Sequence, residues 1–409
     1  MINSGDTAWM LVSAALVMLM TPGLAFFYGG MVRKKNILSI LMQCFIILCA
    51  LTIQWVLFGY SLSFAPSTGF WGGFGWLGLR GVGLEPYADY AATIPHQLFM
   101  VYQGMFAVIT PALIVGAFAE RMKFSAFLVF TLLWATFVYD PLCHWVWGIG
   151  GWLRNMGALD FAGGTVVHIN AGIAALVTAI VIGKRRNCDS YVSPPHNLPF
   201  VVLGTALLWF GWFGFNAGSA LAANGLAVNA FVVTNTAAAA AGLSWALIEW
   251  LRNGKPTMFG AASGAVAGLV AITPAAGFVD VVSAIIIGLF VSVFCFIAVS
   301  VIKPKLGYDD SLDAFGVHCV GGIWGALATG LFASKVINPA GADGLFFGNP
   351  RQLLVQLIAV LVTLVYTFVA TSLIYGVVNF FMIARVGQKE EDKGLDLTQH
   401  RERAYTVLE

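Results

Sequence analysis

Residues 160–172 read DFAGGTVVHINAG, and this stretch combines a charged residue, a tight turn and a histidine in one apolar segment. His168 lies eight residues after Asp160, at the start of a run that is hydrophobic enough to cross a membrane. Asp160 is placed to cap a helix, and Gly163 and Gly164 allow a tight turn into it. The histidine needs an explanation, because a charged side chain inside a bilayer costs about 2.5–3.5 kcal/mol.

The composition of the whole chain is that of an integral membrane protein. Of the 409 residues, 59% are hydrophobic and 10% are charged, and the mean hydropathy is +0.85; soluble domains carry about 25% charged residues. A net charge of +2 argues against nucleic acid as a partner, which would need clustered Lys and Arg. We expect one membrane domain, residues 1–385, followed by a polar cytoplasmic tail, residues 386–409.

Apolar runs of about 20 residues, enough for a helix to cross roughly 30 Å of hydrocarbon, recur eleven times. They lie near residues 7–32, 37–62, 95–119, 124–147, 163–183, 198–217, 229–251, 258–274, 278–302, 313–333 and 352–384. The run at 258–274 is short and rich in Gly and Ala. The sequence thus predicts an all-α integral membrane protein with eleven transmembrane helices.

The loops between these helices carry an asymmetry of positive charge. If the N-terminus lies outside, twelve Lys and Arg residues fall in inner loops and four in outer loops. The inner set is Arg33, Lys34, Lys35, Arg121, Lys123, Lys184, Arg185, Arg186, Arg252, Lys255, Lys303 and Lys305; the outer set is Arg80, Arg154, Lys335 and Arg351. Positive charge stays on the cytoplasmic side, so we expect an N-out, C-in, multi-pass protein of the cell inner (cytoplasmic) membrane.

The two halves of the chain contain a weak repeat. PGLAFFYGG (22–30) in the first helix aligns with FGWFGFNAGS (210–219) in the sixth, and ITPA occurs in the third (109–112) and at the end of the eighth (272–275). Asp160 precedes His168 in the fifth helix as Asp313 precedes His318 in the tenth. Because five is odd, the halves have opposite orientation. This predicts a five-plus-five inverted repeat with a long last helix added, a plan that places a transport pathway between the repeats.

His168 and His318, the repeat-related pair, admit three interpretations. They could be neutral core histidines, metal ligands, or polar elements of a permeation path. A metal would need three or four ligands, and no His-x-x-x-His, Glu-x-x-His or Cys cluster accompanies them, so we expect no metal and no cofactor. At about 1.5 Å per residue, His168 lies about 8 Å below the outer end of its helix, whereas His318 lies in the inner third of the other. Contact between the rings would require shortened helices or deep vestibules.

Aromatic residues gather near the expected outer mouth. Scattered aromatics there usually form an interfacial belt, which is our interpretation of Trp145. A cluster of Trp and Phe near a hydroxyl can instead hold a small cation, with each ring face contributing about 0.5–2 kcal/mol, and Ser219 could accept a hydrogen bond from it. The aromatic residues near the mouth are Tyr102, Phe106, Trp145 and Trp147, with Trp212 and Phe215 on the sixth helix.

Taken together, these stretches resemble the ammonium transporter (Amt) branch of the Amt/Rh/methylammonium-permease family. The matching motifs are FFYGG (26–30), QGMFA (103–107), GAFAERM (116–122), GALDFAGGTVVHINAG (157–172), GWFGFNAGS (211–219), FGVHCVGGIWG (315–325) and the tail GLDLTQHRERAY (394–405). The resemblance implies an eleven-helix inverted-repeat fold, a homotrimer with one pore per subunit, and ammonium as substrate with methylammonium as its analogue.

The resemblance also implies roles for individual residues in the outer half of the pore. Phe106, Trp147 and Ser219 resemble an outer recruitment site, and Phe106 and Phe215 resemble a stacked gate beneath it. We choose Trp147 over the neighbouring tryptophans because it is the one followed by glycines.

Below the gate, His168 and His318 resemble twin histidines that line the pore. Asp160 would cap and orient the fifth helix and favour cations at the mouth, without binding the ion directly. The inner apolar pore would be lined by Leu24, Phe27 and Tyr28.

The predicted function is therefore conduction of ammonium or ammonia, with deprotonation near the gate. The alternatives are an Rh-type ammonia/CO2 gas channel, against which Trp147 and Ser219 argue, and an ammonium sensor with little flux. We find no nucleophile, acid–base set or cofactor loop, so we expect no enzyme. The tail is expected either to be solvated and partly disordered or, by resemblance, to gate the pore and contact a P-II signalling protein.

Overall fold

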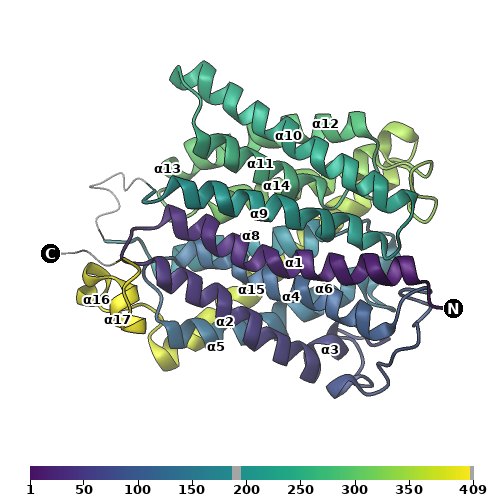
Figure 1. Cartoon of the computed structure of the whole chain (residues 1–409), viewed down its shortest axis with the longest axis horizontal. Coiled ribbons are helices and arrows are strands. Elements are labelled where there is room, and N and C mark those ends of the chain that lie inside the picture. The colour runs from purple at the N-terminus through teal and green to yellow at the C-terminus, as the bar shows by residue number, and fades with distance from the viewer. Residues whose placement is uncertain (187–194, 406–409) are drawn as a thin grey trace.

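The computed structural model describes residues 1–186 and 195–405, which form a bundle of roughly parallel and antiparallel helices (Figure 1). Ten helical segments in these ranges are long and apolar enough to cross a membrane, and a shorter apolar helix, α11 (Met258–Ile272), lies between the seventh and the eighth of them. Each segment matches one predicted run, and α11 is the run predicted to be short. The prediction of an all-α membrane protein is confirmed.

The helices have the following bounds. The spanning segments are α1 (Ser4–Met31); α2 (Ile37–Gln54) with η1 (Trp55–Gly59) and α3 (Tyr60–Phe64); α4 (His96–Phe118); α5 (Phe124–Trp134) with η3 (Ala135–Tyr139) and α6 (Asp140–Trp147); η4 (Gly164–Ile169) with α8 (Asn170–Ile182); α9 (Leu198–Ala217) with η5 (Gly218–Ala220); α10 (Gly225–Asn253); α11; α12 (Val281–Ile297) with η6 (Ala298–Ile302) and α13 (Lys303–Leu306); η7 (Phe315–Cys319) with α14 (Val320–Phe332); and α15 (Pro350–Met382). Shorter helices are η2 (Leu77–Leu79), α7 (Trp152–Met156), η8 (Leu345–Phe347), α16 (Gln388–Lys393) and α17 (Leu395–His400).

The two sequence halves meet along α1 and α9, which lie side by side through the middle of the molecule (Figure 1). Small residues permit this approach, as they do in membrane bundles generally. A Cβ added at Gly204 would lie 2.2 Å from the backbone nitrogen of Phe27. The first and sixth spans, which the repeat pairs with each other, are thus also neighbours in space.

A second reciprocal contact joins the fifth and tenth spans. Gly172 lies one turn after His168, and a Cβ there would be 2.3 Å from the backbone nitrogen of Cys319. Gly322 lies one turn after His318, and a Cβ there would be 2.9 Å from the Ile169 side chain and 3.0 Å from the Gly164 carbonyl. In each of these two spans, the glycine therefore lies against the start of the other span.

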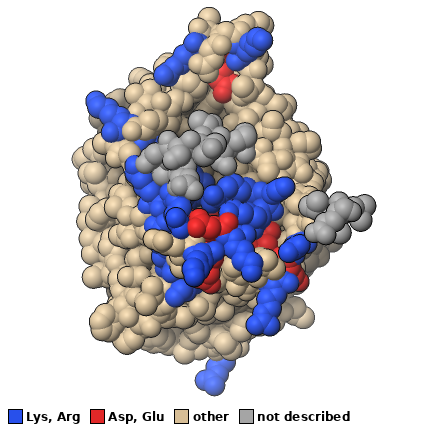
Figure 2. Space-filling model, turned by 90° about the vertical axis from the view of Figure 1, so that its left-hand side faces the viewer, with Lys and Arg blue, Asp and Glu red and all other residues tan. Residues whose placement is uncertain are grey.

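Ionic contacts tie together the end of the bundle that carries the tail. The buried carboxylate of Glu120 accepts hydrogen bonds from the backbone and side chain of Arg33 and pairs with Arg185 at 3.3 Å. Arg185 also pairs with Asp309 at 2.9 Å. Burial raises the pKa of Asp309, but the hydrogen bonds and charge of Arg185 outweigh it and hold that pKa at about 2. Lys and Arg gather on this face (Figure 2), as the predicted inner loops require.

The tail forms two short helices instead of remaining wholly extended. The amide of Leu395 donates to Asn36 Oδ1 at 2.8 Å, and Asp396 Oδ1 accepts from the amide of Ser39 at 2.8 Å. Glu391 pairs with Arg385 at 2.9 Å. The first two contacts dock α17 against the loop between α1 and α2 and the start of α2, and the third joins α16 to the segment that follows α15.

The glycine contacts predict a sharp difference between two Gly→Ala substitutions. Gly172→Ala should destabilise the protein by about 1–3 kcal/mol or more, because the added methyl meets backbone of the tenth span that cannot move aside. Gly376→Ala, in α15, has open space around the new Cβ and should be neutral or slightly stabilising, since Ala favours helix. Thermal unfolding of the purified variants in detergent measures both. Equal midpoints for the two variants would contradict the close approach.

Candidate functional site

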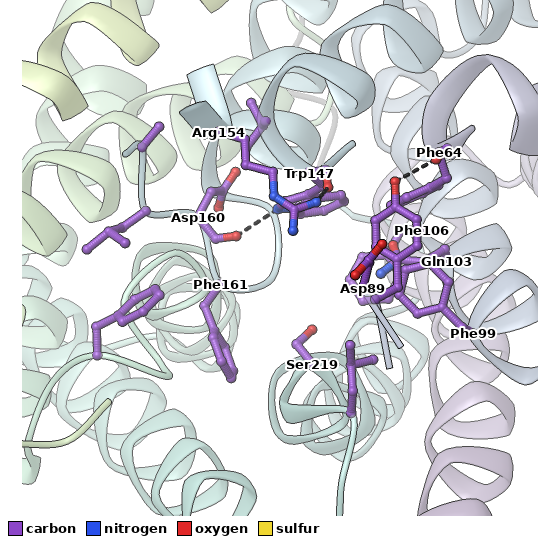
Figure 3. A pocket seen from close by; sticks show the side chains of 16 residues that line it. Phe64, Asp89, Phe99, Gln103, Phe106, Trp147, Arg154, Asp160, Phe161 and Ser219 are labelled. Carbon is purple, nitrogen blue, oxygen red and sulfur yellow. Dashed lines mark hydrogen bonds between the residues drawn. The ribbon is translucent and has the colours of Figure 1, made fainter. Parts of the chain in front are cut away.

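A cavity of about 260 Å³ is lined by residues of α4, the end of α6, η5 and the segment between α7 and η4. Trp147 and Ser219 face it from opposite sides, and Gln103 and Phe106 face it from a third (Figure 3). Trp147 ends α6, Ser219 lies in η5, and the other two lie one helical turn apart on α4. The structure thus brings together the three residues predicted for an outer recruitment site.

The orientation of Trp147 is fixed by two hydrogen bonds. Its Nε1–H donates to the carbonyl of Asp160 at 2.8 Å, and its own carbonyl accepts from Arg154 Nη1 at 2.7 Å. The indole N–H is therefore used, and the ring itself lines the cavity. Trp145 lies elsewhere: it donates to the Phe70 carbonyl at 2.8 Å and packs on Tyr366.

Two side-chain oxygens that line the cavity, on Ser219 and Gln103, can accept hydrogen bonds, and the guanidinium of Arg154 also lies in the wall (Figure 3). Ser219 Oγ lies 2.9 Å from the Phe215 carbonyl, to which it donates, and 3.2 Å from the Tyr102 hydroxyl. Because its proton is directed to a carbonyl, Ser219 can offer a lone pair. Gln103 Oε1 is buried and has no hydrogen-bond partner within the described residues. Gln103 belongs to the motif QGMFA (103–107), from which no role was predicted for this residue.

Two phenylalanines close the floor of this cavity. The rings of Phe106 and Phe215 lie 4.3 Å apart between centroids, with planes tilted by 38°. Both are about 1% exposed, so no open water path passes between them. Trp147 meets Phe106 edge to face at 6.0 Å. The predicted gate pair is therefore in contact, directly beneath the predicted recruitment residues.

The two histidines lie immediately below. The rings of His168 and His318 have centroids 5.4 Å apart and planes within 13° of each other, and His168 lies 6.1 Å from Phe215. Neither ring nitrogen of His168, nor Nδ1 of His318, has a hydrogen-bond partner in the part of the chain that the structure describes. Among these same residues no group of three or more His, Cys, Asp and Glu could hold a metal.

The rings of His168 and His318 are in contact, although counting residues along the helices placed them at different depths. Both helices begin late, at Gly164 and Phe315, only four and three residues before their histidines. Each opens with a turn of π-helix, η4 or η7. These two segments, of 19 and 18 residues, are the shortest of the ten spanning segments in the described residues, as contact between the rings required.

Two small chambers continue the path toward the tail face. They measure about 10 and 20 Å³, close to the space of a single water-sized molecule. Leu24 and Phe27 line the first, and Phe27 and Tyr28 line the second, so all three residues predicted for the inner pore border a chamber. His318 borders both.

Asp160 holds the start of the fifth span. Its carboxylate accepts from the backbone N–H groups of Gly163 at 3.0 Å, Thr165 at 2.9 Å and Val166 at 3.2 Å, from that of Gly164, and from the Thr165 hydroxyl. Gly163 adopts φ +118°, a conformation that L side chains rarely take. The carboxylate is thus occupied by its own helix, and its side chain is buried.

In the other half, the structure corrects the pairing of aspartates. Asp313 was expected to match Asp160, but its carboxylate pairs with Lys303 at 2.6 Å. Asp310 instead accepts from the backbone of Phe315 at 2.7 Å, at the start of the tenth span. Asp310 lies eight residues before His318, the same spacing as Asp160 to His168. Equal spacing was the signal that would have identified it.

Comparisons with known proteins agree with this geometry. Residues 8–405 match the profile described as Ammonium Transporter Family. The chain is 57% identical to the ammonium transporter of Bacillus subtilis, covering 98% of both chains, and 51% identical to ammonium transporter Amt1 of Archaeoglobus fulgidus, covering 99% of this chain and 100% of that one. The crystal structure of Saccharomyces cerevisiae Mep2 has 38% identity and a TM-score of 0.89, covering 95% of this chain and 89% of Mep2.

A solved structure described as a sensor Amt protein is also similar, with 30% identity, a TM-score of 0.88, and coverage of 97% of this chain and 98% of that one. The resemblance seen in the sequence motifs is confirmed.

The cap contacts predict that Asp160→Ala costs far more than the loss of an ordinary cap. The substitution would leave several buried N–H groups without an acceptor and should lower the free energy of unfolding by at least about 3 kcal/mol. Asp280→Ala, which removes one cap bond to the amide of Ser283 on α12, should cost about 1 kcal/mol. Thermal midpoints, together with hydrogen exchange at Gly163–Val166, measure the difference. Equal loss in both variants would show that the carboxylate does not hold this turn.

Proposed function

The chain belongs to the Ammonium Transporter Family, and from that premise we propose how its residues conduct the substrate. It is a multi-pass membrane transporter of ammonium and not an enzyme. One observation carries the proposal. Successive side chains contact one another from the outer cavity to the membrane interior, in the order Trp147, Phe106, Phe215, His168 and His318.

We propose that the outer cavity selects the cation. The face of Trp147 attracts a small cation by about 0.5–2 kcal/mol, and more as water is removed. Ser219 and Gln103 offer acceptor oxygens, which replace part of the hydration shell of ammonium. A cation of similar size without N–H donors, such as potassium, gains the ring attraction but no directed hydrogen bonds.

Beneath this site the ion must lose its proton. The chambers are bordered largely by Leu, Phe, Val and Met side chains, and an unpaired charge in such surroundings is far more costly than a neutral molecule. Ammonia is small enough for the chambers. We therefore place deprotonation near the Phe106–Phe215 gate, at or above the histidines. The proton passes either to water in the outer cavity, which leaves a net flux of ammonia, or to a ring nitrogen of His168, which gives a current.

The histidines then act on the neutral molecule or on the proton. Their unpartnered ring nitrogens border the chamber below the gate, where they can bind ammonia or pass a proton between the two rings. The two versions differ in whether a current accompanies the flux.

An Rh-type gas channel would need no cation-selecting cavity, and a sensor would need no flux.

The assembly and partners follow from the resemblance. We propose a homotrimer with one pore per subunit in the cytoplasmic membrane, with the N-terminus outside. The docked tail, at the face rich in Lys and Arg, is proposed to gate the pore and to form the contact surface for a P-II signalling protein. Ammonium and methylammonium are the proposed substrates, with no cofactor or metal.

The recruitment site predicts a shift in apparent affinity. Trp147→Leu should raise the half-saturating ammonium concentration by about fivefold to thirtyfold, since it removes a ring worth about 1–2 kcal/mol. Trp152→Leu, at a partly exposed tryptophan outside the cavity, should change it by less than about twofold. Competition by ammonium of radiolabelled methylammonium uptake gives both values. An unchanged half-saturation in Trp147→Leu would remove this residue from the site.

The histidine pair predicts loss of selective transport when both rings are removed. His168→Ala with His318→Ala, reconstituted in liposomes on a solid-supported membrane, should lose at least about 90% of the ammonium-evoked current, because no group remains to bind ammonia or carry the proton. Matched thermal midpoints control for folding. Unchanged ammonium uptake would contradict the role of the pair.

For the unmodified protein, normal ammonia flux without current would rule out the electrogenic version.

A further inference from the structure

A second large cavity lies outside the pore, at the junction of the tail and the loop between α1 and α2. Its volume is about 380 Å³, within the range of about 300–1,000 Å³ that small-molecule sites occupy. The loop contributes Lys34 and Lys35, and the tail contributes Lys393, Arg403 and Tyr405. The cavity opens on the face where Lys and Arg gather (Figure 2).

The acidic groups of the docked tail are already engaged. Asp392 pairs with Arg186 at 2.6 Å, and Glu391 pairs with Arg385 at 2.9 Å. Asp396, 3% exposed, accepts from the amide of Ser39 at the start of α2. Asp392 and Glu391 are therefore paired with other basic residues, whereas Asp396 lies in the cavity wall, where its Oδ2 has no partner among the described residues and its charge balances part of the positive charge.

Three of those basic groups remain without a counter-charge. Lys34, Lys393 and Arg403 are exposed and form no ion pair with any residue in the ranges 1–186 and 195–405. Lys35 donates to the carbonyls of Glu391 and Asp392, which anchors the loop to the tail while its positive charge remains. Glu402 is the remaining acid in the wall, so the cavity is positive overall.

An aromatic ring completes the wall. The hydroxyl of Tyr405 lies 2.9 Å from Nε2 of His196, whose Nδ1 lies 2.8 Å from the carbonyl of Val32 at the end of α1. Tyr405 is thus held in place although its ring is 40% exposed. A flat apolar surface next to a group of cations suits a phosphate-bearing molecule with a planar or acyl portion.

We propose that this cavity binds a phosphate-bearing anion that bridges the α1–α2 loop and the tail. Arg403 can hold two phosphate oxygens at once, and the ammonium groups of Lys34 and Lys393 supply point charges. Because Lys34 belongs to the loop and the other two to the tail, the site is complete only when the tail is docked. By linkage, the ligand stabilises that docked state. The phosphate comes from a soluble nucleoside phosphate or from an anionic lipid headgroup.

The test uses the full-length protein and three probes. Isothermal titration in neutral detergent measures binding of ADP and of inorganic pyrophosphate, and nanodiscs of phosphatidylglycerol or phosphatidylcholine supply the lipid arm. In every arm, the rate of tryptic cleavage after Arg401 reports tail docking. The variant is Lys34→Gln with Arg403→Gln. The matched control is Lys255→Gln with Lys305→Gln, which removes the same charge from two exposed residues elsewhere, one in the loop between α10 and α11 and one in α13.

At least one phosphate probe should bind and slow cleavage after Arg401, and the site variant should weaken binding about tenfold or more, since each charged hydrogen bond is worth about 1.5–3 kcal/mol. The control variant should change binding by less than about twofold. Variant-dependent protection by ADP or pyrophosphate assigns a soluble ligand, and protection by phosphatidylglycerol alone assigns a lipid. No protection by any probe, or equal weakening in the control, overturns the proposal. Equal thermal midpoints of the two variants exclude misfolding as the cause.

Discussion

The close crossing of the fifth and tenth spans is the constraint on which the rest of the molecule depends. It requires glycine at positions 172 and 322, because each lies against backbone or side-chain atoms at the start of the other helix. Each of these glycines follows a histidine by one helical turn, so the crossing also brings His168 and His318 together. For the crossing to occur at the level of the histidines, both helices must begin deep inside the bundle. Their first N–H groups then lie away from water and need acceptors from the protein, and Asp160 and Asp310 meet part of that need.

The outer part of the pathway follows from this arrangement. The chain that reaches the buried start of the fifth span must turn inward between Trp147 and Gly164, and that turn supplies the Asp160 carbonyl that orients the Trp147 ring. The ring then lies over Phe106, Phe106 over Phe215, and Phe215 beside His168. One backbone turn therefore connects the cap of a helix to the selection of a cation. A change at Asp160 would affect both, although the carboxylate itself is fully engaged by its helix.

Much of this could be predicted from the sequence, for identifiable reasons. Hydropathy located the membrane-spanning helices, including α11, because the length of an apolar run is set by consecutive residues and needs no knowledge of distant contacts. The repeat and the family motifs pointed to side chains that the structure brings together around the outer cavity and the two chambers. The depth of the histidines could not be predicted, because counting residues from a hydropathy boundary assumes that a helix begins at the membrane surface. Asp313 was matched to Asp160 because it precedes His318 at the edge of an apolar run, and Asp310 was not considered. Gln103 was not predicted, because an amide without a hydrogen-bond partner can be recognised only once its neighbours are placed.

The folding of the tail onto the α1–α2 loop depends on contacts between residues more than 350 positions apart, such as Asn36 and Leu395.

The late start of the two histidine helices has an electrostatic consequence. An α-helix carries roughly half a positive charge at its N-terminus, and here two such ends, from helices that run in opposite directions, flank the same point in the pore. Asp160 and Asp310 each place a carboxyl group at one of these ends. The two dipoles and the two caps thus oppose each other on either side of the histidine pair. The carboxyl groups therefore offset the positive ends of the two helices, so neither end is left without an acceptor beside the histidine pair.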